Sequence, residues 1–182
     1  MHVMRVDGRR IASLLAALVA LPAAAVASTP VPDGPCRAGE RIVLTCALAK
    51  GRRIGLCASA DLSATGGYLQ YRATRDGTVE LGYPAEREGS RLAFRLAHYF
   101  RYQVDRWSVR FSNKGFTYVV FANSEADATP AVREWGVQVT APGASTPSAT
   151  LRCREPVIAD FSLLEGLVPC DTDDPSNMAR CP

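Results

Sequence analysis

Apolar residues recur at every second position in a series of short segments, and this alternation limits the possible folds more than any other feature of the sequence. The spacing places successive apolar side chains on one face of a β-strand. Short segments of this kind, with glycine and proline between them, favour an antiparallel sandwich or barrel of about eight or nine strands. We therefore expect an all-β fold with a short C-terminal helical turn near Ser162–Glu165, where serine and glutamate stand at capping-box spacing.

Two hairpins stand out in this pattern. In the first, a three-residue loop, Arg75-Asp76-Gly77, has glycine at the left-handed position, and the register places Leu69 opposite Tyr83 and Tyr71 opposite Leu81. In the second, the chain reverses at Asn113-Lys114-Gly115, and the register pairs Phe111 with Phe116 and Trp107 with Val120. Further strands are expected at Arg41–Leu48, Arg53–Ala58, Arg91–Phe100, Val132–Thr140 and Ser148–Cys153.

The first 27 residues have the features of a cleavable secretory signal. Three arginines precede an apolar run, Ile11–Val26, and Ala25-Val26-Ala27 supplies the small residues that signal peptidase requires. Residues 28–35, rich in proline, predict a flexible leader, and residues 36–182 predict a single domain. We therefore expect a bacterial periplasmic or secreted protein that does not span a membrane after cleavage.

The charge balance argues against a nucleic-acid partner. Without the signal, 18 basic and 17 acidic groups remain. Phosphate binding requires a basic excess on one face, which this composition does not predict. We expect a monomer that binds a protein partner.

All six cysteines follow the signal, and an even number in an exported chain predicts three disulfides. Cys46 and Cys57 flank Lys50-Gly51-Arg52-Arg53 symmetrically, so we expect them to face each other across a hairpin. Cys153 could then pair with Cys170, and Cys36 with Cys181. No C-x-x-C pair occurs, and His98 is the only histidine after the signal, so no metal ion or other cofactor is expected.

His98 is the obvious candidate for a catalytic base. It alternates with Leu92, Phe94, Leu96 and Phe100, which places it on an apolar strand face and favours a packed, hydrogen-bonded histidine. The sequence has no G-x-S-x-G elbow to supply a nucleophile, and a cysteine in a disulfide cannot attack. No catalytic residue is therefore assigned, and the protein is expected not to be an enzyme.

Two charged segments suggest binding sites, each with a simpler interpretation. Asp171–Asn177 gathers oxygen ligands of the kind that calcium takes, but it lacks the central glycine and terminal glutamate of a calcium loop, which favours a solvated acidic turn. Five arginines interleaved with aromatic residues could form a nucleic-acid or glycan surface, or simply the wet face of a sheet. These arginines are Arg91, Arg95, Arg101, Arg106 and Arg110.

The segment from Cys57 to Arg72 carries a resemblance. Cys57-Ala58-Ser59, Asp61-Leu62 and Gly67-Tyr68-Leu69-Gln70-Tyr71-Arg72 resemble a family of uncharacterised exported proteobacterial proteins. More distantly, Thr65-Gly66-Gly67-Tyr68 is similar to the Ser-Gly-x-Tyr motif of periplasmic inhibitors of invertebrate-type and goose-type lysozymes, which are small β-sandwich proteins. The likeness covers about fifteen positions. Thr65 replaces that family's serine, and its cysteine pattern differs.

This resemblance implies that the Thr65–Tyr68 loop enters an enzyme cleft. Thr65 and backbone N–H groups would donate hydrogen bonds to catalytic carboxylates, and Tyr68 would supply rigid contact area. The simpler alternative is a tight turn at Gly66-Gly67, with Tyr68 packing on the core. The sequence therefore predicts an exported binding protein, with lysozyme inhibition as its most specific form. An envelope interaction or immunity-type protein with another partner, or a secreted hydrolase, are the alternatives.

Overall fold

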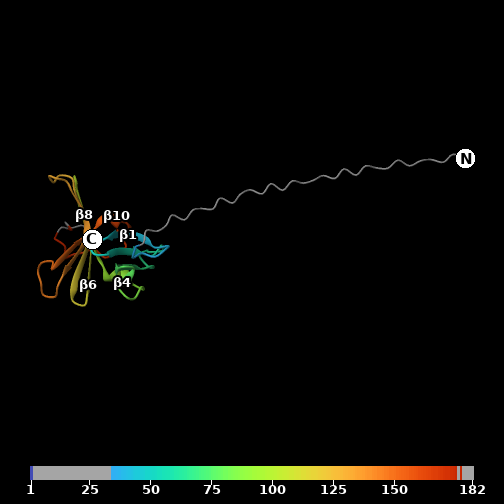
Figure 1. The fold of residues 1–182 in the computed structure, drawn as a ribbon, viewed down its shortest axis with the longest axis horizontal. Helices are drawn as coiled ribbons and strands as arrows, with labels where there is room; N and C mark the ends of the chain where they lie inside the picture. Colours follow the sequence, from blue (N-terminus) through green and yellow to red (C-terminus); the bar gives the residue numbers. More distant parts are fainter. Residues whose placement is uncertain (2–33, 176, 178–182) are drawn as a thin grey trace. The chain divides into compact units, whose positions relative to one another are not determined.

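Two antiparallel five-stranded sheets make up the fold of this computed structural model, which describes Met1, residues 34–175 and residue 177 (Figure 1). The expected signal and most of the leader fall on residues 2–33, outside the described residues. The first sheet has the order β10-β1-β2-β3-β4 and the second the order β5-β6-β7-β8-β9. Their bounds are β1 (Arg41–Ala47), β2 (Arg52–Ala58), β3 (Leu69–Arg75), β4 (Thr78–Tyr83), β5 (Arg95–Arg101), β6 (Val104–Asn113), β7 (Phe116–Glu125), β8 (Val132–Thr140), β9 (Ala149–Arg152) and β10 (Arg154–Ala159).

The chain changes sheets between β9 and β10. Strands β1 to β4 form most of the first sheet and β5 to β9 form the whole of the second, and β10 then returns to pair with β1, at the opposite end of the sequence (Figure 1). Two short 3-10 helices complete the fold, η1 (Ser90–Ala93) and η2 (Phe161–Leu164). The expected antiparallel β-sandwich with a short C-terminal helical turn is therefore confirmed.

The core lies between the two sheets and is largely aromatic at its centre. The Phe111 ring stacks on Tyr83 from the first sheet at 4.7 Å and on Tyr118 from its own sheet at 4.8 Å between centroids. Tyr71 and Phe94 pack against the same ring at 5.1 and 5.4 Å. Such tilted and offset contacts stabilise a core beyond the area that they bury.

Both predicted hairpin registers are wrong by two residues on one strand. Tyr71 lies opposite Tyr83 rather than Leu81, and Phe111 lies opposite Tyr118 rather than Phe116. In the first hairpin the turn holds two residues, 76 and 77, instead of three, and a register shift between Ala73 and Thr74 adds the second residue of the difference. In the second hairpin the two-residue turn lies at 114 and 115, one residue later than the expected register places it. Such two-residue turns match the twist of the strands that they connect.

Two strand predictions need correction. The expected strand Arg91–Phe100 begins only at β5, because η1 occupies its first residues, and both Leu92 and Phe100 are exposed. β10 was not predicted. The expected capping box is also absent, since Asp160 is the N-cap of η2 and caps no backbone N–H with its side chain, while Ser162 Oγ donates to Asp160 at 2.5 Å.

The disulfides differ from all three expected pairs. Cys46 bonds to Cys153, and Cys36 bonds to Cys57. Cys46 and Cys57 cannot pair because Cys46 lies opposite Ile54, three residues from Cys57, so the two side chains point to opposite faces of the sheet.

Each disulfide has a clear structural role. Cys153 lies between β9 and β10, so its bond to Cys46 joins the two sheets where the chain crosses. The Cys36–Cys57 bond holds the segment before β1 against the outer face of the first sheet. Cys170 is also disulfide-bonded, whereas Cys181 lies outside the described residues. None of the described residues forms a helix that is both long and apolar enough to cross a membrane.

Candidate functional site

The loop between β2 and β3 is held in one conformation by its own hydrogen bonds. At its base, Ser59 N–H donates to Tyr68 O and Ser59 Oγ accepts from Tyr68 N–H, both at 2.9 Å. At its tip, Ser63 N–H donates to Gly66 O and Gly66 N–H donates to Ser63 Oγ, both at 3.0 Å. Thr65 and Gly66, at the tip of the loop, are exposed. The loop therefore presents Thr65 on a closed turn.

Gly67 allows the loop to close. Its φ of +77° is a left-handed value, and a Cβ there would lie 2.5 Å from both Leu62 Cα and Ser59 Oγ. A side chain at this position would therefore strain the backbone and collide with the opposite arm of the loop. The hydrogen-bonded turn spans Ser63–Gly66, so it lies earlier than the tight turn expected at Gly66-Gly67, and Gly67 leads out of it.

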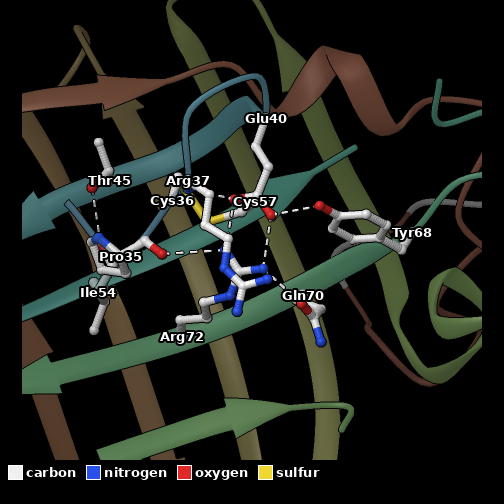
Figure 2. Close-up of a disulfide and its surroundings, with 10 residues drawn as sticks. All are labelled: Pro35, Cys36, Arg37, Glu40, Thr45, Ile54, Cys57, Tyr68, Gln70 and Arg72. Atoms are coloured by element: carbon white, nitrogen blue, oxygen red, sulfur yellow. Dashed lines mark hydrogen bonds and ion pairs between the residues drawn. A yellow bond between two sulfur atoms is a disulfide. The ribbon is translucent and has the colours of Figure 1, made fainter. Parts of the chain in front are cut away.

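Tyr68 lies differently from both sequence interpretations. Its ring is half-buried, and its hydroxyl donates to Glu40 Oε1 at 2.7 Å, so it neither projects as a free contact residue nor packs in the core between the sheets (Figure 2). This hydrogen bond raises the pKa of Tyr68 above its ordinary value. Tyr68 is better described as the anchor of the loop.

Glu40 and Arg72 form a buried ion pair behind that anchor. Arg72 Nη1 and Nη2 donate to the two oxygens of Glu40 at 2.6 and 2.8 Å, and the side chains are only 6% and 3% exposed (Figure 2). Gln70 Oε1 and Pro35 O accept the remaining Arg72 bonds. The sequence carries no signal for this pair, because the residues lie 32 positions apart with no shared motif.

The charges in this network stabilise one another. Burial alone would raise the pKa of Glu40, but hydrogen bonds from Arg72, the Arg37 backbone N–H and Tyr68 outweigh it and hold the pKa below its ordinary value. The same contact with Glu40 raises the pKa of Arg72. A buried pair that satisfies its hydrogen bonds in this way resists separation, because either charge left alone would be desolvated without a partner.

Within the described residues, one group of metal-type ligands lies close together at this place. Ligand atoms of Cys36, Glu40 and Cys57 lie within 4.8 Å of one another. Both sulfur atoms are in a disulfide, however, and Glu40 already binds Arg72. A disulfide cannot supply the thiolates that a metal ion would need, so the arrangement is structural.

Two arginines flank the loop. The Arg91 guanidinium donates to Ala64 O at the tip and to Leu167 O at 2.8 Å, and the Arg87 guanidinium lies 4.7 Å above the Tyr68 ring centre. Arg91 also lines a cavity of about 490 Å³ beside His98 and Glu165. Positive charge therefore lies at the tip of the loop, through Arg91, and at its base, through Arg87.

His98 is packed and hydrogen-bonded. Its ring stacks on Trp107 with centroids 3.4 Å apart, Nε2 lies 2.8 Å from Asp105, and Nδ1 lies 3.4 Å from Glu165. Because a carboxylate faces each ring nitrogen, neither nitrogen is placed to take a proton from a hydroxyl. This geometry agrees with the structural interpretation of His98.

The acidic tail is docked on the second sheet through Arg110. Arg110 donates to Asp171 through both Nε and Nη2 and to Asp173 at 2.8 Å, and Asp171 is only 1% exposed. Ser108 Oγ donates to Asp174 at 3.1 Å. Asp171 and Asp173 neutralise an arginine, and Thr172, Asp173 and Pro175 remain exposed, so the turn faces solvent as the sequence favoured but is anchored at Asp171.

Four of the five predicted surface arginines, Arg95, Arg101, Arg106 and Arg110, lie on the face of β5 and β6 that points away from the core, whereas Arg91 lies in η1. Arg101 and Arg106 pair with Asp127 and Glu125, and Arg110 and Arg91 hold the tail and the loop. These ion pairs neutralise much of the positive charge that binding to a polyanion would require.

Comparison of the chain with protein-family models, with curated proteins and with solved structures finds no match.

Proposed function

We propose that the protein is an exported binding protein that inhibits a peptidoglycan-cleaving enzyme by inserting the Ser63–Gly66 loop into its cleft. The observation that carries the proposal is the loop itself, which is exposed at Thr65 yet closed by hydrogen bonds at tip and base. A binding loop that is already ordered loses little conformational entropy on association, and this favours affinity.

The chemistry of the loop suits the active site of a glycosidase. Such enzymes cleave with a pair of carboxyl groups in a cleft. Thr65 offers a hydroxyl donor, the Arg91 guanidinium stands beside the tip, and the Arg87 guanidinium lies over Tyr68 at the base of the loop. Charge-assisted hydrogen bonds from these groups to carboxylates are stronger than bonds between neutral partners.

The remainder of the fold supports an inhibitor that acts outside the cytosol. The Cys36–Cys57 disulfide and the Glu40–Arg72 pair hold the surface behind Tyr68, which fixes the loop relative to the sheet. Disulfides persist in oxidising compartments such as the periplasm. With the expected signal, this favours a periplasmic or secreted protein.

An inhibition assay tests the proposal. Purified mature protein is titrated against chicken-type, invertebrate-type and goose-type lysozymes, and we expect inhibition of at least one of them at micromolar concentration or below. Thr65→Ala should weaken inhibition about tenfold or more, which corresponds to loss of a charge-assisted hydrogen bond. Thr146→Ala, at another exposed loop position, is the matched control and should inhibit like the wild type.

Tyr68→Phe tests the anchor separately. It removes only the hydroxyl that binds Glu40, so inhibition should weaken while circular dichroism stays unchanged. Absence of inhibition by the wild-type protein towards all three enzyme types would exclude the proposed function. Equal inhibition by the Thr65→Ala variant would instead exclude this loop as the contact.

A further inference from the structure

A second cleft lies away from the loop, between the strands of the second sheet and the segment Ala159–Ser162. Its volume is about 310 Å³. Trp107 on β6 and Trp135 on β8 both lie opposite Ala122 on β7. Because neighbouring strands lie about 4.8 Å apart, the two tryptophan backbones are about 10 Å apart. The small side chain of Ala122 lies between them in the sheet, and all three residues line the cleft.

A third aromatic ring helps to enclose the cleft. Phe161 of η2 is buried, and its ring lies 6.4 Å from that of Trp107. Trp107 and Trp135 are half-buried and line the cleft. His98 covers one face of Trp107, so a ligand would meet the opposite face or the edge of that indole.

The charged groups in the cleft are acidic. Asp105 and Asp160 line it, and no lysine or arginine is among its described lining residues. Asp105 already has His98 as a partner at 2.8 Å. Asp160 is exposed and accepts a hydrogen bond from Ser162 Oγ, so its carboxylate is oriented but not neutralised by that contact. The cleft therefore combines aromatic walls with an excess of negative charge.

We propose that this cleft binds a small organic cation with a substituted ammonium group. The face of an aromatic ring attracts a cation, most strongly when the ring belongs to tryptophan, and walls of this kind recognise quaternary ammonium groups. Methyl groups on the nitrogen would pack on Trp107 and Trp135, while Asp160 would balance the charge. A hydrated metal ion would gain little from aromatic walls, since hard cations take oxygen ligands.

Intrinsic fluorescence offers a direct test, because Trp107 and Trp135 are the only two tryptophans in the chain. We expect titration with choline to change the emission saturably. The neutral control is 3,3-dimethyl-1-butanol, which has the shape of choline without its charge. It should bind at least about fivefold more weakly if cation–π attraction contributes. Equal binding of the two compounds, or no response to choline up to 50 mM, would overturn the proposal.

Variants then separate charge from shape. Asp160→Asn should weaken choline binding about fivefold or more, whereas Glu88→Gln, which removes an exposed carboxylate elsewhere, should leave it unchanged. Trp135→Phe should also weaken binding, with Trp107 still reporting. Circular dichroism melting checks that each variant is folded. Unaltered choline affinity in Asp160→Asn, or tighter binding of a neutral disaccharide than of choline, would contradict a cation site.

Discussion

Removing the carboxylate of Glu40 should strongly destabilise the fold. Glu40→Gln keeps the size of the side chain but leaves the buried Arg72 guanidinium without a counter-charge. Breaking a buried pair on one side costs about 3–5 kcal/mol. With a urea m-value of about 2 kcal/mol/M, this lowers the unfolding midpoint by about 1.5–2.5 M. Equilibrium urea unfolding followed by circular dichroism, with the disulfides intact, measures the difference.

Two further variants make the test decisive. Asp127→Asn breaks the exposed pair with Arg101 and should cost less than about 1 kcal/mol. Replacing both buried partners, as Glu40→Leu with Arg72→Met, should recover much of the loss, because no unpaired charge stays buried. If Glu40→Gln lowered the free energy of unfolding no more than Asp127→Asn does, the buried pair would not stabilise the fold.

The same pair predicts a dependence on pH. The pKa of Glu40 is lowered in the folded protein from its ordinary value of 4.5, so as the pH falls the unfolded chain takes up the proton first. The stability that the pair contributes is therefore present above about pH 4.5 and is lost as the pH falls further. The difference in stability between the wild type and Glu40→Gln should narrow over that acidic range and stay constant from pH 6 to 8.

Further predictions concern the loop and the disulfides. Gly67→Ala should destabilise the protein by about 2 kcal/mol or more in thermal melts and weaken inhibition, because it adds left-handed strain and a clash; a neutral effect would contradict the loop geometry. Replacing Cys46 and Cys153 by alanine should cost about 4–5 kcal/mol, whereas replacing Cys36 and Cys57 should cost about 3 kcal/mol, because the first bond closes 107 residues and the second 21. Non-reducing peptide maps that recover Cys46 joined to Cys57 would contradict both pairings.

The sequence predicted the class of fold because alternation of apolar residues is a local signal. It placed most strands, but it did not predict the register, since one residue fewer in the turn at Asp76-Gly77 and the irregularity between Ala73 and Thr74 each shift the pairs that follow. β10 was not predicted from the sequence because it is an edge strand that contains Pro156 and is largely exposed, so it has no alternating apolar pattern. The disulfide pairing depended on which face each cysteine occupies, and that follows from the register.

For the candidate sites too, local sequence signals are readable whereas contacts between distant segments are not. The Thr65–Tyr68 loop could be located from its glycines, which are local signals. The partners that decide its behaviour, Glu40 behind Tyr68 and Arg91 at the tip, come from distant segments. The cleft between Trp107 and Trp135 depends equally on the pairing of three strands. These arrangements arise only when the sheets assemble.

Steady-state kinetics of an inhibited lysozyme test the central claim most directly. If the Ser63–Gly66 loop occupies the catalytic cleft, the protein should raise the apparent KM for a soluble peptidoglycan or chitin oligomer and leave kcat unchanged, and Thr65→Ala should shift the inhibition constant about tenfold. A lowered kcat with unchanged KM, or no inhibition of any lysozyme type at micromolar protein, would contradict the account.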